Sequence, residues 1–379
     1  MEWTIRGGDV LIAISLCMIV KNEEHHLNRC LSRITDIVDE IVIVDTGSTD
    51  RTKEIARSFQ AVVYDFEWID DFAAARNFAF SKASQDYILW LDADDVLLEE
   101  DRMKLIALKE NLTPDIDSVT MLYHLSSDEF GNVTFRLRRN RLVKRSRAFR
   151  WIGPVHEYLE VYGHVLNSDV AITHLSSNHD PDTGRNLRIY VQREAAGESF
   201  TPRDLFYYAN ELKDHRLFEK AIDYYERFLH TEKGWVEDVL SACSRLSDCH
   251  HELGNGQAAF ESSLRSLQYA PPRAEFCCRI GYHFLEKNQY DTAIYWYKLA
   301  TELELPPDYM GFHNPSFSTW LPHLQLAVCY DRIGAYALAN QHNDKALAYR
   351  PGDETMLANQ EYFRNKLQEL QRDDERQSS

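Results

Sequence analysis

Three carboxylates, Asp92, Asp94 and Asp95, follow directly after the apolar segment 87–91. Five apolar or aromatic residues in a row predict a buried strand. Because like charges repel one another, a cluster of carboxylates at a strand end favours a bound cation. Mg²⁺ or Mn²⁺ holding a pyrophosphate is the economical candidate, since these ions take a few carboxylate oxygens and complete their shell with phosphate oxygens and water. The alternative is an acidic turn whose aspartates cap a helix over residues 97–110.

A second polar cluster begins at Asp45, the last residue of the apolar segment 40–45, and continues as Thr-Gly-Ser-Thr-Asp. The glycine suits a tight turn, and Ser48 or Thr49 suits the N-cap of a following helix. The Asp45 carboxylate can accept a hydrogen bond from a nucleobase N–H group while the turn lets a nucleotide lie against the backbone. Helix capping alone would explain Ser48, Thr49 and Asp50, but it would not explain Asp45.

A third candidate is Arg76, one turn into the Ala-rich segment 72–83. An arginine fork at this position can engage a carboxylate or a phosphate. The alternative is an ordinary salt bridge to Asp71 or to Asp92.

The segments that carry these residues alternate between strand and helix patterns. The predicted strands cover residues 11–20, 40–45, 62–66 and 87–91, and the predicted helices cover 24–35, 49–60 and 72–83. Strands separated by helices of this length imply crossover connections and a mainly parallel sheet. In such a sheet, ligands bind outside the carboxyl ends of the strands. The polar clusters 21–24, 45–50 and 92–94 all lie at those ends, so three segments point to one crevice.

The length of 379 residues suggests two or three domains. A hydrophobic share of 44% and a charged share of 27% are typical of a globular protein with full cores. With 42 basic and 60 acidic residues the net charge is −18, which disfavours nucleic acid or an anionic membrane as the main partner. A local basic stretch at 136–150 is the exception.

The seven cysteines form no CxxC pair and no framework spacing, so we expect reduced, mostly buried thiols of a cytoplasmic protein and no zinc site. The apolar segment 10–20 lacks the flanks of a signal peptide. It is also too short to span a bilayer. We therefore interpret it as the first buried strand and expect no transmembrane segment.

From about residue 205 the pattern changes to helix pairs with small residues at regular intervals. Ala221, Ala259, Ala293 and Ala339 are separated by 38, 34 and 46 residues. A unit of about 34 residues is typical of tetratricopeptide repeats, so the excess in the last interval predicts an insertion at 306–319. An unspecialised helical bundle is the alternative. The charged terminus is poor in apolar residues, which predicts disorder over 366–379.

The segments MIVKNEE, VDTGSTD, DDFAAARN and LDADD, in this order, resemble the family 2 glycosyltransferases over roughly residues 12–175. The resemblance implies an α/β fold: a GT-A nucleotide-diphospho-sugar transferase domain with a Rossmann-like mixed sheet, over residues 1–200. An all-α tetratricopeptide-like repeat domain would follow over 201–365, with the tail at 366–379.

The family resemblance also implies roles for individual residues. A UDP-sugar donor, with UDP-glucose or UDP-N-acetylglucosamine as the candidates, would be bound by Asn22, Glu23, Asp45, Ser48, Asp71, Arg76 and Asp92. Mg²⁺ or Mn²⁺ would be bound by Asp94, with His156 or His174 completing the shell or pairing with a phosphate. For either histidine the alternative is a structural role.

The segment 150–158 resembles a subgroup with a Val-His-Glu motif and a helical-repeat tail, which includes bacteriocin peptide S-glycosyltransferases and some lipopolysaccharide-core transferases. Inverting transfer needs an acceptor-side carboxylate to take the acceptor's proton, and Glu157 is the candidate. Asp95 departs from the subgroup, which often has Asn or Glu there.

These features predict an inverting, metal-dependent transfer of a hexose to a Cys or Ser side chain of a peptide or protein. The repeats would hold part of this acceptor, because the concave surface of a repeat array suits an extended peptide. The alternatives are an acceptor that is a cell-envelope glycan or lipid-linked sugar, which the basic stretch would suit, and an inactive scaffold that binds partners through the repeats. A nucleotidyltransferase on the same scaffold would need a glycine-rich loop after the first strand, and this sequence has no such loop there. The sugar, the base, the acceptor atom and the formation of a homo-oligomer stay open.

Overall fold

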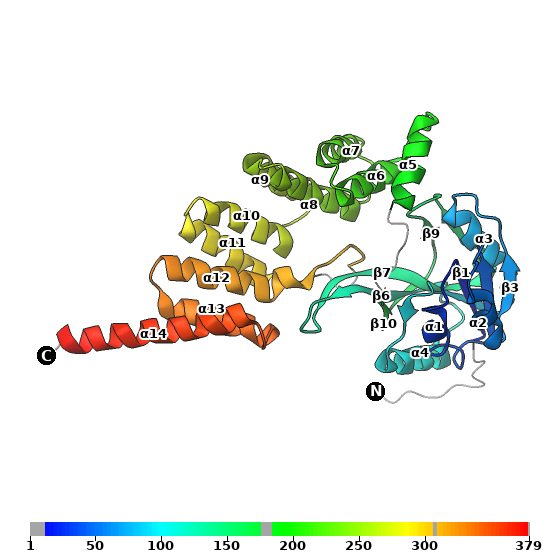
Figure 1. The fold of residues 1–379 in the computed structure, drawn as a ribbon, viewed down its shortest axis with the longest axis horizontal. Coiled ribbons are helices and arrows are strands. Elements are labelled where there is room, and N and C mark those ends of the chain that lie inside the picture. The colour runs from blue at the N-terminus through cyan, green and yellow to red at the C-terminus, as the bar shows by residue number, and fades with distance from the viewer. Residues whose placement is uncertain (1–11, 176–183, 306–308, 378–379) are drawn as a thin grey trace. The chain divides into compact units, whose positions relative to one another are not determined.

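The computed structural model describes residues 12–175, 184–305 and 309–377. The chain divides into two compact units, whose elements are drawn in Figure 1. The first unit contains Met1–Leu125 and Arg136–Ile189, and the second contains Ser126–Phe135 and Tyr190–Ser379. The second unit therefore includes a ten-residue segment, 126–135, from the first half of the sequence.

An eight-stranded sheet organises the first unit, in the order β3-β2-β1-β4-β7-β6-β10-β5. Its strands are β1 (Ile14–Val20), β2 (Glu40–Asp45), β3 (Val62–Asp65), β4 (Tyr87–Trp90), β5 (Asp95–Val96), β6 (Ser118–Ser127), β7 (Val133–Lys144) and β10 (Val165–His174). The strands β3, β2, β1 and β4 are parallel, whereas β7 pairs antiparallel with β4. The mainly parallel sheet predicted from the sequence is thus the first half of a mixed sheet. The difference arises because β6 and β7 are joined by a short connection, which reverses the chain.

Helices cover both faces of this sheet: α1 (Leu27–Leu31), α2 (Thr52–Ser58), α3 (Phe72–Lys82) and α4 (Glu99–Asn111), with a 3₁₀ turn at Arg145–Arg147. On one face, Leu16 and Met18 of β1 belong to a core that also contains Leu27 and Leu105. On the other face, Cys17 packs in a second core with α3 and with a small sheet of β8 (Arg150–Ile152) and β9 (Tyr158–Glu160). Successive residues of a strand point to opposite faces, which explains why almost every residue of β1 is apolar, with Ser15 as the exception.

The second unit is built from helix pairs. Its helices are α5 (Arg185–Ala195), shared with the first unit, α6 (Pro202–Asp214), α7 (Phe218–His230), α8 (Val236–Glu252), α9 (Gly256–Arg265), α10 (Ala274–Glu286), α11 (Tyr290–Glu302), α12 (Trp320–Arg332), α13 (Tyr336–Tyr349) and α14 (Glu354–Gln377), with 3₁₀ turns at Ser266–Gln268 and Pro315–Ser318. The four spaced alanines are all buried, each on the second helix of a pair. A Cβ on Gly281 would lie 3.0 Å from the Tyr297 ring, so glycine allows α10 and α11 to approach closely. The predicted repeats are confirmed.

The predicted insertion at 306–319 is described from Tyr309 onward, because residues 306–308 lie outside the described ranges. In the described part, the Tyr309 hydroxyl donates to the Phe312 carbonyl at 2.8 Å. Further along the chain, α14 is helical through 366–377, where the sequence predicted disorder. Leu, Gln, Glu and Arg are good helix formers, which accounts for the continuation of α14 through this charged stretch. Residues 378–379 lie outside the described ranges.

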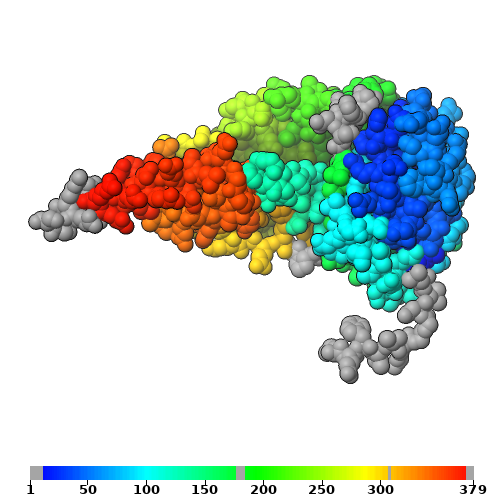
Figure 2. Space-filling model, turned by 60° about the horizontal axis from the view of Figure 1, so that its bottom comes forward, coloured from blue at the N-terminus to red at the C-terminus, as the bar shows by residue number. Residues whose placement is uncertain are grey.

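The hairpin tip, defined here as residues 126–135 between β6 and β7, contacts the last repeats of its own unit. Arg350 forms an ion pair of 2.6 Å with Glu129, and its guanidinium lies 4.5 Å from the centre of the Phe130 ring. The Asn132 side chain donates to the Tyr349 carbonyl at 2.9 Å. In Figure 2 the teal surface of the tip meets the orange surface of the helices near residue 350. The tip is therefore a structural part of the repeat unit.

Two further sequence predictions have outcomes in the structure. All seven cysteines are buried and unpaired. Over the described residues, none of the helices has both the length and the apolar composition needed to cross a membrane.

Candidate active site

The carboxyl ends of β1, β2 and β4 border a cleft of about 340 Å³ in the first unit. Many of the predicted site residues line it, namely Glu23, Arg76, Asp92, Asp94, His156, Glu157 and His174. Aromatic side chains of Trp68 and Phe72 form another part of the wall. The three polar segments that the sequence placed at one crevice each contribute at least one residue to it.

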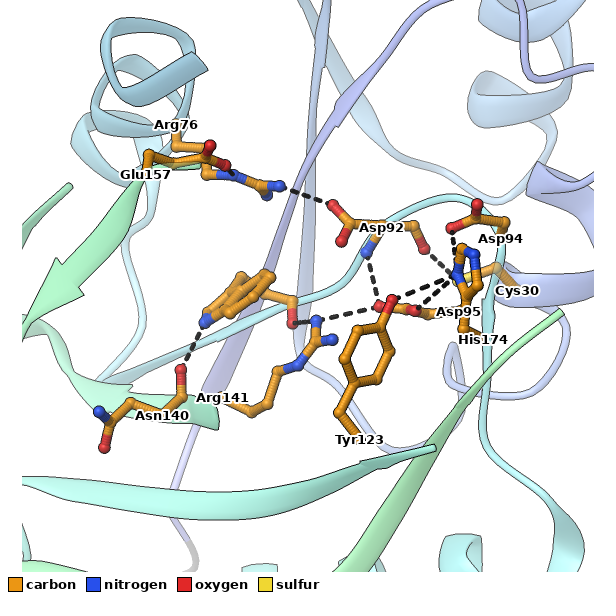
Figure 3. A network of polar contacts seen from close by, with 11 residues as sticks. Cys30, Arg76, Asp92, Asp94, Asp95, Tyr123, Asn140, Arg141, Glu157 and His174 are labelled. Carbon is orange, nitrogen blue, oxygen red and sulfur yellow. Dashed lines mark hydrogen bonds and ion pairs between the residues drawn. The ribbon is translucent and has the colours of Figure 1, made fainter. Parts of the chain in front are cut away.

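Arg76 connects the predicted base to the acidic turn (Figure 3). Its Nε donates to Glu157 Oε1 at 2.6 Å, and its Nη2 donates to Asp92 Oδ1 at 2.8 Å. The guanidinium lies 5.0 Å from the Trp90 ring and 4.9 Å from the Trp151 ring, and the residue is only 7% exposed. Burial acts to lower the pKa of Arg76, but the charges of Asp92 and Glu157 outweigh it and raise the pKa.

The same ion pair determines the charge of Asp92. Burial acts to raise the pKa of Asp92, but Arg76 and then Arg141 outweigh it and hold the pKa well below its usual range. Asp92 is therefore ionised. Of the two salt-bridge partners considered for Arg76, Asp92 is the observed one. Asp71 instead caps α3 by accepting from the Ala74 N–H at 2.8 Å, and it does not line the cleft.

Asp94, Asp95 and His174 form a group that can hold a metal ion, with ligand atoms all within 4.8 Å of one another. The Nδ1 atom of His174 lies 3.4 Å from Asp94 Oδ1 and 4.0 Å from Asp95 Oδ1. Asp95 Oδ1 is buried and has no hydrogen-bond partner among the described residues. Burying such an oxygen without a partner is costly, so this donor set fits a divalent cation. His156 lines the cleft but is outside this group, and its assignment as a ligand stays a prediction.

Asp95 also has a structural partner that sequence reasoning missed. Its Oδ2 accepts from Arg141 Nη1 at 2.9 Å and from the Asp92 N–H at 3.0 Å. Arg141 is fully buried, and its guanidinium lies 3.8 Å from the Trp90 ring and 4.4 Å from the Tyr123 ring. Burial raises the pKa of Asp95, although Arg141 acts in the opposite direction. The basic stretch at 136–150 thus supplies a buried counter-charge to the acidic turn.

Asp45 builds the turn beside the cleft. Its Oδ1 accepts from the N–H groups of Gly47 at 3.0 Å and Ser48 at 2.9 Å, while its buried Oδ2 has no hydrogen-bond partner among the described residues. Burial acts to raise the pKa of Asp45, but the hydrogen bonds from Ser48 and Gly47 outweigh it and lower the pKa. Gly47 has a φ of 103°, a conformation that favours glycine.

Asn22 locks this turn to the end of β1. Its N–H donates to Ser48 Oγ at 2.9 Å, and its side-chain oxygen accepts from the Thr49 N–H at 2.8 Å. Asn22, Asp45 and Ser48 do not line the cleft themselves, whereas the adjoining Thr46 does. In the structure their contacts shape the wall, and their predicted binding of the donor stays a prediction.

Residues 15–162 match the model of the family described as Glycosyl transferase family 2. Over 335 residues the chain is 30% identical to a TPR repeat-containing protein of Synechococcus elongatus, covering 86% of this chain and 75% of that protein. Over 257 residues it is 28% identical to the SPbeta prophage-derived glycosyltransferase SunS of Bacillus subtilis, covering 62% of this chain and 58% of that protein. Among solved structures, a tetratricopeptide repeat protein from Parabacteroides merdae is 12% identical and covers 51% of this chain and 70% of that chain, at a TM-score of 0.39.

Proposed function

This chain belongs to the family 2 glycosyltransferases and carries tetratricopeptide-like repeats, and we propose that it moves a hexose from a UDP-sugar to a peptide or protein side chain by inverting, metal-dependent transfer. The observation that supports this proposal best is the chain of contacts from Glu157 through Arg76 to Asp92. It brings a carboxylate suited to proton abstraction into one cleft with the group Asp94 and His174, which can hold a cation.

In the proposed reaction Glu157 takes the proton from the Cys or Ser side chain of the acceptor. The acceptor atom forms a bond to the anomeric carbon, and the bond from that carbon to the nucleoside diphosphate breaks. Arg76 fixes the direction of the Glu157 carboxylate through Oε1. A divalent cation held by Asp94, Asp95 and His174 would stabilise the negative charge on the leaving diphosphate.

A groove of about 680 Å³ in the second unit supports a peptide acceptor. Aromatic residues of the insertion, Tyr309, Phe312 and Phe317, line it together with Phe135 of the hairpin tip. The surface of a repeat array suits an extended chain. An envelope glycan or lipid-linked acceptor has less support, because the basic stretch proposed to contact it contains the fully buried Arg141. The buried, unpaired cysteines fit a cytoplasmic reaction.

The test is to incubate the full chain with a panel of nucleotide-sugars and Mn²⁺ and to measure the released nucleoside diphosphate. We expect release from a UDP-hexose, and no release when EDTA is present. Adding peptides that differ only by Cys, Ser or Ala at one position should then give a product one hexose heavier for Cys or Ser. Release from no UDP-sugar, or sugar transfer in EDTA, would contradict the proposal.

A further inference from the structure

The family resemblance assigned Arg76 to the binding of the nucleotide-sugar. In the structure, however, its Nε and Nη2 atoms already form hydrogen bonds to Glu157 and Asp92. Its guanidinium is also enclosed by two tryptophan rings. A diphosphate carries negative charge into a cleft whose turn contains three carboxylates, so it needs another cation. We propose that Arg139 of β7 supplies it and binds the donor diphosphate directly, an inference that rests on the proposed nucleoside-diphosphate donor.

Arg139 lines the cleft beside the acidic turn that contains Asp92 and Asp94. Its guanidinium lies 5.3 Å from the centre of the Tyr123 ring and 5.8 Å from that of the Trp90 ring. Arg141 contacts the same two rings from two residues further along β7. This matches strand geometry, in which residues i and i+2 share a face.

The two arginines differ in their ionic partners. Arg141 is fully buried and bonded to Asp95, whereas Arg139 is half-buried and forms no ion pair within the described residues. An arginine fork matches two phosphate oxygens at once. Lys21 also lines the cleft, but it is exposed and well solvated, so its charge is screened. Arg139 is therefore a cleft-lining cation that is both partly desolvated and available to an anion. Arg185, whose guanidinium lies 4.7 Å from the Phe72 ring, is a second cation in the wall, but it lies away from the Trp90 and Tyr123 rings that Arg139 contacts beside the acidic turn.

Arg138 provides a matched control on the same strand. It is the adjacent residue and points to the opposite face, where its Nη1 donates to the Ser168 carbonyl at 2.6 Å. Replacing either arginine by Gln removes one positive charge and keeps most of the aliphatic stem. Arg139→Gln and Arg138→Gln therefore have the same effect on net charge, and only the first removes a cation from the cleft.

The experiment measures the binding of UDP, ADP and GDP to the full chain by calorimetry, in Mg²⁺ and separately in EDTA, together with the melting temperature of each variant. We expect Arg139→Gln to weaken UDP binding at least about 10-fold in both conditions, the effect of losing charge-assisted hydrogen bonds. Arg138→Gln should bind UDP like wild type.

The outcomes separate this inference from the proposed function. If wild type binds none of the three diphosphates, the proposed function fails and this inference fails with it. If wild type binds UDP and Arg139→Gln binds it equally well while folded, the inference alone is wrong. Equal weakening by both substitutions would show a general effect of net charge and would also overturn it. Arg139→Lys keeps the charge without the fork and should bind with intermediate affinity, which remains measurable should the Gln variant not fold.

Discussion

The Arg76 Nε and Glu157 Oε1 atoms lie 2.6 Å apart, with both side chains largely shielded from solvent. The guanidinium of Arg76 therefore orients the proposed base, and it also contacts the acidic turn through Asp92. One carboxylate oxygen of Glu157 is engaged by Arg76, and the second is the atom we expect to receive the acceptor's proton. This geometry links the position of the base to the position of the donor.

Glu157→Gln should retain donor binding and lose turnover by at least roughly 10²-fold, the low end of general-base catalysis. Glutamine keeps the shape and an oxygen for Arg76, but it cannot take a proton. Steady-state kinetics and UDP-sugar calorimetry on the same preparation check both parts. If the acceptor is a Cys thiol, whose unperturbed pKa is about 8.5, part of the lost rate should return at higher pH. Near-normal turnover in the variant would show that another group is the base, with His156 and Asp95 as the candidates.

Asp94→Ala should abolish metal-dependent UDP-sugar binding and turnover while leaving thermal unfolding nearly unchanged, because its carboxylate is 27% exposed in the cleft. Calorimetric titration with Mn²⁺ gives a readout that does not depend on activity. The matched variant is Asp95→Asn, which breaks a fully buried pair with Arg141. It should cost about 3–5 kcal/mol of stability. Full activity of wild type in EDTA, or of Asp94→Ala in Mn²⁺, would refute the metal site.

Phe312→Ala should raise the acceptor KM while leaving donor hydrolysis unchanged. Phe312 lines the groove of the second unit and stacks on Phe135 at 5.0 Å between ring centres. Phe317 also lines the groove, but it packs against the repeat core, so its removal would also affect folding. The stack itself is worth about 0.5–1.5 kcal/mol, which permits a small fall in melting temperature. A larger fall with an unchanged acceptor KM would show that the insertion only packs the repeats.

The repeat unit should lose stability in mild acid because of His342. This residue stacks on Tyr330, and its Nδ1 lies 3.1 Å from that of His323. Burial, with the charges of His323, Lys345 and Lys298, lowers the pKa of His342 to about 4. The unfolded chain, with a His pKa of about 6.5, binds the proton more tightly. This contribution to stability is therefore complete above pH ~6.5 and is lost as the pH falls toward 4.

His342→Phe keeps an aromatic ring against Tyr330 and removes the titrating group. Between pH 7 and pH 4.5 its melting temperature should fall less than that of wild type by at least ~2–4 °C, which corresponds to about 1 kcal/mol for a unit of this size. His230→Gln is the control, because the His230 side chain is 76% exposed. It should follow the wild-type curve. Equal falls for all three proteins would rule out His342 as the source.

The first half of the sheet and the repeats could be predicted because their signals are local. The strand 40–45 has the predicted bounds, and the small residues of the repeats lie where the second helices pack. The pairing of β7 with β4 joins segments about 50 residues apart and has no local signal. The basic stretch 136–150 was therefore interpreted as a surface, although part of it is an interior strand.

For the site, the sequence predicted roles for the acidic turn and Glu157, because each follows a recognisable pattern, and the structure brings both to one cleft. The sequence could not identify which carboxylate pairs with which arginine. The Arg141 partner of Asp95 and the enclosure of Arg76 by Trp90 and Trp151 depend on long-range packing. Each of these contacts joins segments that carry no pattern relating them.

The hairpin tip imposes a rule on protein engineering. A chimera that exchanges only residues 190–379 would leave Glu129 and Phe130 of one parent facing the position of Arg350 from another. A functional exchange must therefore transplant 126–135 together with the helices. The same rule applies to sequence divergence, since substitutions at Arg350 should be accompanied by compensating changes in a segment more than 200 positions earlier. Two separate segments of the coding sequence therefore encode one structural unit.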